Sequence, residues 1–175
     1  TPFNVATLGS FFSPTTYVGA FGPTETPTSN WASGWTFQLF PPAGCPTGTT
    51  DSGTTVAGQR VCNVTGVYTN DLRLTAGNSY RLNGRVDIGA DVGADGLKPG
   101  GDAADLTIEA GVTVFGNSGA DYLVVNRGSK IFSNGTAAAA VRFTSLADLS
   151  DPARNDDANT AEWGGIVVLG RAPIN

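Results

Sequence analysis

The sequence predicts an all-β solenoid, and three observations support this fold class. Four short apolar runs begin at Leu106, Leu123, Val141 and Ile166, and Gly or polar residues close each of them. The runs start 17, 18 and 25 positions apart, which is typical of a solenoid with one strand-bearing coil per repeat. Gly and Pro recur at short intervals and no stretch keeps a 3.6-residue apolar period, so we expect little helix.

A repeated phrase follows the first two runs. Ala110-Gly-Val-Thr-Val114 matches Arg127-Gly-Ser-Lys-Ile131, with the glycine in register and a β-branched residue three places later. Leu72 lies 34 positions before Leu106, which equals two intervals of 17, so the repeat extends back at least this far. The residues that we expect to stack in the core include Val125, Phe143 and Val168.

Residues 1–40 differ from the rest of the chain because they are rich in aromatic residues and almost uncharged. Glu25 is their one charged residue, and Trp35-Thr-Phe-Gln-Leu-Phe40 alternates as a strand does. A segment this apolar must bury its rings. We interpret it as a cap or side flap of the domain, with an intermolecular contact strand and an aromatic cleft for sugars as alternatives. Its nine aromatic residues are Phe3, Phe11, Phe12, Tyr17, Phe21, Trp31, Trp35, Phe37 and Phe40.

Residues 41–61 are rich in Pro, Gly and Thr, and we expect a loop between the N-terminal segment and coils at residues 62–175. Cys45 and Cys62 have no CxxC pair and no histidine nearby, which disfavours a zinc site. We expect a disulfide, worth about 3 kcal/mol through its effect on chain entropy. A reactive thiol is the alternative. A disulfide implies an oxidising compartment, so the expected location is extracellular or at the cell surface.

Charge and composition exclude several function classes. The net charge is −5, and ten basic residues scattered among 15 acids do not form the basic stripe that nucleic-acid binding needs. An apolar run of about 20 residues, the length that spans a bilayer, is absent from the sequence. The chain has no histidine, which removes Ser-His-Asp and Cys-His catalysis together with imidazole metal sites.

Two acidic stretches are candidate ligand sites. Residues 89–105 carry four aspartates on a Gly-rich loop, and flexible loops rich in oxygen suit Ca²⁺. Their spacing is not that of an EF-hand, so a solvated turn is the main alternative. Residues 147–162 form a second acidic insert, and such inserts often collect on the binding face of a solenoid. The candidate Ca²⁺ ligands are Asp91, Asp95, Asp102 and Asp105.

Two further features bear on processing. The chain has no methionine and begins Thr1-Pro2, so we expect that a preceding segment was removed or that the chain is a piece of a longer or tandem protein. Asn63-Val-Thr65 and Asn134-Gly-Thr136 fit the glycosylation sequon, which matters only in a host that uses it.

Five phrases after Asp105 carry a family resemblance. They are Leu106-Thr-Ile-Glu-Ala-Gly-Val-Thr-Val-Phe115, Tyr122-Leu-Val-Val-Asn-Arg-Gly-Ser-Lys-Ile131, Asn134-Gly-Thr136, Val141-Arg-Phe-Thr-Ser145 and Trp163-Gly-Gly-Ile-Val-Val-Leu-Gly-Arg-Ala-Pro-Ile-Asn175. Together they resemble the opening coils of bacterial secreted or surface proteins, many described only as lipoproteins or hypothetical proteins. The resemblance implies a right-handed parallel β-helix (solenoid) and carries over no catalytic residues. Residues 11–40 are similar to the segment that usually closes such proteins, so the order looks permuted.

Our first hypothesis for function is a structural surface protein that self-associates, head to tail, into a filament. An uncapped solenoid end invites stacking, and heterologous contacts of this kind build fibres. This protein would have no enzymatic activity, and its partner would be a second copy of the chain. The candidate assembly residues are Phe11, Phe12, Tyr17, Phe21, Trp31, Trp35, Phe37, Trp163, Ile166 and Val168.

Two alternatives come from other function classes. A polysaccharide-binding or lyase-like module is similar in scaffold to polysaccharide lyases, although this argument is an analogy from fold. An accessory subunit of a larger surface complex would dock its apolar front segment on a different partner. The side chains that offer lyase-type chemistry are Asp87, Asp91, Asp95, Lys98, Lys130 and Arg142.

Overall fold

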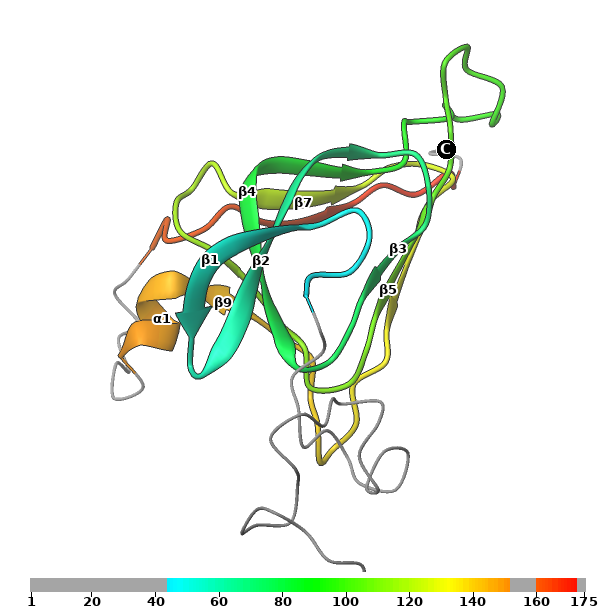
Figure 1. The fold of residues 1–175 in the computed structure, drawn as a ribbon. Coiled ribbons are helices and arrows are strands. Elements are labelled where there is room, and N and C mark those ends of the chain that lie inside the picture. Colours follow the sequence, from blue (N-terminus) through cyan, green and yellow to red (C-terminus); the bar gives the residue numbers. More distant parts are fainter. Residues whose placement is uncertain (1–43, 152–159, 173–175) are drawn as a thin grey trace, which may run out of the picture. The chain divides into compact units, whose positions relative to one another are not determined.

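The computed structural model describes residues 44–151 and 160–172, and strands dominate this part of the chain (Figure 1). The expectation of little helix is confirmed, because α1, Leu146–Ser150, is the one α-helix within these two ranges. The strands in chain order are β1 Thr50–Val56, β2 Gln59–Tyr68, β3 Leu72–Leu74, β4 Asn78–Ile88, β5 Asp105–Ile108, β6 Thr113–Gly116, β7 Tyr122–Val125, β8 Lys130–Ser133, β9 Arg142–Ser145 and β10 Gly165–Val168.

Parallel pairing arranges β2 to β10 in three columns, and the long strands β2 and β4 each belong to two of them. The first half of β4 lies between β2 and β6, and β9 follows β6. The second half lies between the end of β2 and β7, and β10 follows β7. The third column is β3, β5 and β8, and Figure 1 shows β3 and β5 side by side, apart from β4 and β7. Gly84 divides β4 with a φ of +75°, a backbone conformation that glycine adopts without strain.

Alternation along the strands gives each column one apolar, buried side. In β4, Tyr80 and Leu82 are at most 2% exposed and Arg81 between them points to the other side. The register places Tyr80 between Cys62 of β2 and Val114 of β6, both buried. Equivalent positions of successive strands therefore stack on one another to form the core.

The columns correct the predicted repeat. Leu72 and Leu106 are direct partners, so the interval between them is one step of the stack, where the spacing had predicted two. Leu123 pairs with Val86 in a different column, so the interval from Leu106 to Leu123 is a step within one turn of the chain. The repeated phrase is a turn followed by a strand, because Gly111 and Gly128 both have a positive φ, +78° and +95°.

Residues 41–61, which we expected to form a loop, contain β1 and the start of β2. These two strands form an antiparallel hairpin in which Val56 pairs with Gln59. Ala57 and Gly58 between them have φ values of +48° and +77°, as a type I′ turn requires. The hairpin was not predicted from the sequence because β1 is polar and because Ala57, which is not a glycine, occupies the first position with a positive φ.

The predicted disulfide between Cys45 and Cys62 is present. Cys62 is fully buried in the core cluster, and Cys45 packs against that cluster from outside. The hydroxyl of Tyr68 donates to the backbone oxygen of Gly48 over 2.7 Å, so the segment after Cys45 is held against the first strands at a second point.

The last strand departs from the predicted core. Val125 is fully buried and Phe143 is partly buried against the core, but Val168 is 61% exposed. Val168 occupies the same column position as Val125, its partner in register. The difference arises because β10 pairs with β7 on one edge and, within the described ranges, with no strand on the other. Ile166 is 38% exposed for the same reason.

Candidate functional site

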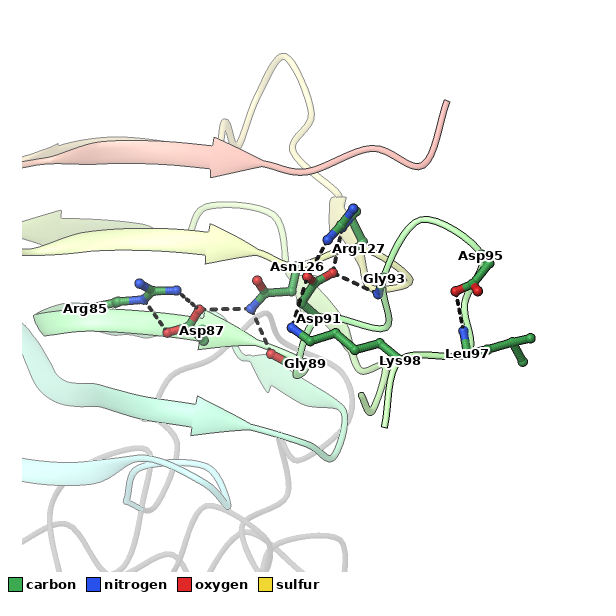
Figure 2. A network of polar contacts seen from close by, with 10 residues as sticks. All are labelled: Arg85, Asp87, Gly89, Asp91, Gly93, Asp95, Leu97, Lys98, Asn126 and Arg127. Carbon is green, nitrogen blue, oxygen red and sulfur yellow. Dashed lines mark hydrogen bonds and ion pairs between the residues drawn. The ribbon is translucent and has the colours of Figure 1, made fainter. Parts of the chain in front are cut away.

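Two neighbouring groups of polar contacts, together called the corner network, lie at one corner of the fold, where β4 and β7 end (Figure 2). Arg85 donates two hydrogen bonds to the carboxylate of Asp87, over 2.6 and 2.8 Å. The side-chain amide of Asn126, in the turn after β7, donates to Asp87 over 2.9 Å and to the backbone oxygen of Gly89 over 2.8 Å. Asn126 is only 5% exposed, so it joins the two neighbouring strands from a buried position.

The same corner holds a long loop, residues 89–104, that replaces the short turns found at 69–71 and 126–129. Its carboxylate Asp91 accepts two hydrogen bonds from Arg127, over 2.7 and 2.6 Å. Lys98 reaches the same carboxylate at 3.5 Å, and the backbone N–H of Gly93 donates to it over 3.1 Å. Asp91 thus fastens the loop to the following turn of the chain (Figure 2).

The electrostatics of this network favour a fixed set of charges. The hydrogen bonds from Arg127 hold the pKa of Asp91 well below its usual range, helped by the Gly93 N–H. The hydrogen bonds from Arg85 likewise lower the pKa of Asp87, and the pKa values of Arg85 and Arg127 are raised in return. A general acid or base works best with a pKa near the working pH. The pKa values of these groups are shifted away from neutral pH, so the network suits binding and positioning better than proton transfer.

The four aspartates predicted to bind Ca²⁺ are not brought together. Asp91 is engaged by Arg127, and Asp95 accepts a hydrogen bond from the Leu97 N–H over 2.9 Å. Asp102 contributes its backbone to a bridge with Ala90, and the carboxylate of Asp105 lies 3.6 Å from Lys130. Within the described ranges, no three His, Cys, Asp or Glu side chains are placed to share a metal ion.

Most cations of the described chain have an acidic partner. Seven of the nine lysines and arginines there form ion pairs, and the exceptions are Arg81 and Arg171. Arg171 donates from Nε to the backbone oxygen of Ala94 over 3.3 Å. Arg81 is half-buried, and its Nε is buried without a hydrogen-bond partner among the residues that the structure describes. An unsatisfied buried donor requires a physical explanation, and a ligand or ordered water is one.

Arg81 belongs to a lateral row on the outer side of the first column. The register aligns Asn63, Arg81, Phe115 and Thr144 on four neighbouring strands. Asn63, directly beside Arg81, has a buried side-chain oxygen that also has no hydrogen-bond partner in the described ranges. The row therefore holds one unsatisfied donor on a cation and one unsatisfied acceptor on an amide, on adjacent strands.

The far end of the row meets the acidic insert. Thr144 and Arg142 both donate to the carboxylate of Asp148, the arginine over 2.6 Å. Ser145 donates to Glu162 over 2.5 Å and accepts a hydrogen bond from the Asp148 N–H over 3.1 Å, which makes it the N-cap of α1. The first and last parts of the predicted insert thus contact the first column, and residues 152–159 lie outside the described residues.

Most of the predicted assembly residues, Phe11 to Phe37, lie outside the described residues. Trp163 is partly buried against the core, and a Cβ added to Gly116 would lie 2.6 Å from the Cβ of Trp163. Ile166 and Val168 are exposed on β10, as described above. Neither the described residues nor the comparisons below support self-association or a filament.

Sequence reasoning missed Arg81, and it singled out Asn63 only as part of a glycosylation sequon. Alternation in Tyr80-Arg-Leu82 indicated that the arginine faces outward, but alternation does not reveal whether a cation has a partner. Which side chains flank Arg81 depends on strands β2 and β6, which join β4 from an earlier and a later part of the chain.

The stacked parallel strands define a protein of the β-helix class. Residues 66–175 match the family described as a pectate-lyase-like beta-helix domain, and the match covers more than half of the chain. The protein therefore belongs to this family. Searches of the curated proteins and of the solved structures found no match. The disulfide and the β-helix domain fit an extracellular protein, and no helix in the described ranges is long and apolar enough to cross a membrane.

Proposed function

We propose that this chain is an extracellular, right-handed β-helix module that binds an acidic polysaccharide along the outer side of its first column. The observation that carries the proposal is Arg81, a half-buried arginine without a carboxylate partner among the described residues, where seven of the other eight lysines and arginines form ion pairs. Membership of a pectate-lyase-like β-helix family supports the class of ligand.

The chemistry of the row matches a sugar acid. The Nε–H of Arg81 needs an acceptor, and a carboxylate is the acceptor that a guanidinium binds most strongly. The side-chain oxygen of Asn63 needs a donor, which a sugar hydroxyl supplies. A uronate carries both groups on one ring, so adjacent strands can satisfy both side chains with one residue of ligand.

We favour binding without cleavage. The carboxylates of the corner network are held ionised by arginines, which is unsuited to proton transfer near neutral pH. A lyase-like activity is the alternative, because the family description names it. Calcium stays a candidate cofactor in the proposal, since Ca²⁺ takes carboxylate oxygens as ligands and an acidic sugar supplies them.

Calorimetric titration of the full chain with polygalacturonate tests this function. We expect Arg81→Ala to weaken binding roughly tenfold to a hundredfold, because a hydrogen bond to a charged group contributes about 1.5–3 kcal/mol. Arg73→Ala is the matched control, since Arg73 is exposed and paired with Glu109, and it should leave the affinity unchanged. Equal loss in both variants would point to general charge attraction and remove the assigned site.

Three further measurements use the same samples. Neutral dextran should not bind, because it has no carboxylate for Arg81. Repeating the titration with a chelator measures the part that Ca²⁺ plays. Ultraviolet absorbance of the incubated polymer detects unsaturated ends, and their release by the protein would overturn binding without cleavage.

A further inference from the structure

Two Asn-Gly dipeptides in the described chain lie in different surroundings. They are Asn83-Gly84, at the division of β4, and Asn134-Gly135, directly after β8. Both asparagine residues are exposed. An asparagine followed by glycine is chemically vulnerable, because the backbone nitrogen of the glycine can reach the side-chain amide with no Cβ in the way.

We propose that Asn134 is a site of spontaneous deamidation, and that the carboxylate of Asp121 protects Asn83 from the same reaction. The backbone nitrogen of Gly135, after losing its proton, attacks Cγ of Asn134 and forms a new N–C bond. The Cγ–Nδ2 bond breaks and ammonia leaves, which gives a cyclic imide. Water then opens the ring at either carbonyl carbon, so the products are aspartate and isoaspartate at position 134.

Protection at the first site is electrostatic. The N–H of Gly84 donates to Oδ1 of Asp121 over 2.7 Å, and the other oxygen of Asp121 accepts from the Asn117 N–H over 2.8 Å. Asp121 is only 8% exposed, so this contact is shielded from water. Removing the Gly84 proton would place a second negative charge beside the carboxylate, which is strongly unfavourable at this separation.

The second site has no such protection. Within the described residues, the N–H of Gly135 donates no hydrogen bond, although its neighbours are anchored. The N–H of Asn134 donates to the backbone oxygen of Ile108 over 2.9 Å, and Thr136 exchanges backbone hydrogen bonds with Ala139. Residues 134–138 are all exposed, so water reaches the imide.

The fold keeps both glycines for reasons unrelated to this chemistry. A Cβ on Gly135 would lie 2.8 Å from the backbone nitrogen of Val141, which is closer than side chains tolerate. Gly84 has open space around it but a φ of +75°. The vulnerable dipeptide at 134–135 therefore follows from the packing of the turn. Its isoaspartate product would lengthen the main chain beside the hydrogen bond that links β8 to β5.

Peptide mapping by mass spectrometry after timed incubation in mildly alkaline buffer tests the proposal. We expect Asn134 to react at least about tenfold faster than Asn83 in the folded chain, since each unit of difference in amide acidity changes the anion population about tenfold. In urea, where Asp121 no longer contacts Gly84, the two sites should react at similar rates. Similar rates in the folded chain, or faster reaction at Asn83, would overturn the inference.

Two variants separate the causes. Asp121→Asn removes the negative charge and keeps the shape, so reaction at Asn83 should accelerate while Asn134 keeps its rate. Asn134→Gln should stop formation of acid at position 134 and leave Asn83 unchanged. If Asp121→Asn retains its circular dichroism spectrum and Asn83 stays slow, the carboxylate is not the protecting group; if the variant unfolds, the ratio of rates in the wild-type chain decides.

Discussion

The corner network and the outer row of the first column use the same residue types in opposite ways. At the corner, Arg85 and Arg127 each meet a carboxylate through two hydrogen bonds. In the row, Arg81 meets none among the described residues, and its Nε is buried without a partner there. The corner lies at the ends of β4 and β7 and in the segments that follow them, and the row lies on strands of the same sheet.

The difference distinguishes ion pairs that stabilise the fold from a group that can bind a ligand. A paired guanidinium has little left to offer a ligand, and its carboxylate partner would have to be displaced first. Partial burial of a guanidinium without a partner already costs free energy, so the binding of an anion to it is the most favourable. The comparison teaches that a ligand site is marked here by the missing partner, and that charge density alone would have pointed to the corner.

The largest expected effect is a loss of stability when the corner network is disrupted, with no such loss when Arg81 of the row is replaced. Asn126→Ala should lower the free energy of unfolding by about 2 kcal/mol, because it removes two hydrogen bonds and takes a donor from the buried oxygen of Gly89. Arg81→Met should be neutral or slightly stabilising, since it keeps the apolar stem and removes an unsatisfied donor. Urea unfolding of both variants measures the contrast.

The sign of the Arg81→Met effect is the sharp point of this comparison. If that variant loses as much stability as Asn126→Ala, Arg81 has a structural partner in solution, and the reason for assigning it to ligand binding disappears. Wild-type protein with and without polygalacturonate provides the reference, because a ligand that binds only the folded chain raises its unfolding midpoint.

An intermediate effect concerns acid. The pKa of Asp91 is lowered in the folded protein by the hydrogen bonds from Arg127, so the ionised form stabilises the fold. This contribution is complete above the pKa of the unfolded chain, near 4, and is lost as the pH falls below it. Wild type should therefore lose stability relative to Asp91→Asn on acidification, and urea unfolding at several pH values measures the difference.

A constant difference between wild type and Asp91→Asn across that pH range would contradict the assigned ion pair. Asp105→Asn is a suitable control, because Asp105 contacts Lys130 only at 3.6 Å. Asp105 lacks the two short hydrogen bonds from an arginine that Asp91 accepts.

The fold class and the apolar runs that form strands could be predicted from the sequence, but the side chains that become neighbours across strands could not. The short apolar runs and the lack of helical periodicity indicated strands, and β5, β7, β9 and β10 lie at the four predicted runs. The predicted spacing failed because each turn of the chain contains more than one strand, so Leu106 stacks on Leu72 and not on Leu123. Leu72 and Leu106 are 34 residues apart, which fits either two repeats of 17 residues or one repeat of 34 residues. The spacing alone therefore could not distinguish the two possibilities.

The candidate site shows the same limit at the level of side chains. The four aspartates of residues 91–105 are close in sequence, yet the loop directs them to different partners. Asn63 and Arg81 lie on different strands, well separated in sequence, and become neighbours through register alone. Sequence proximity overstated the first group and concealed the second, because β pairing decides which side chains meet.

The smallest expected effect is the contribution of the Lys98 ion pair to the stability of the corner network. Lys98 lies 3.5 Å from Asp91, at the limit of a hydrogen bond, and more than half of its side chain is exposed. Exposed ion pairs usually change stability by less than about 1 kcal/mol and weaken further in salt. Lys98→Ala should therefore leave the urea midpoint nearly unchanged, and any small loss should vanish at high ionic strength. A large loss that persists in salt would mean that Lys98 holds the 89–104 loop together with Arg127, and the corner would then depend on three cations and not on its two arginines.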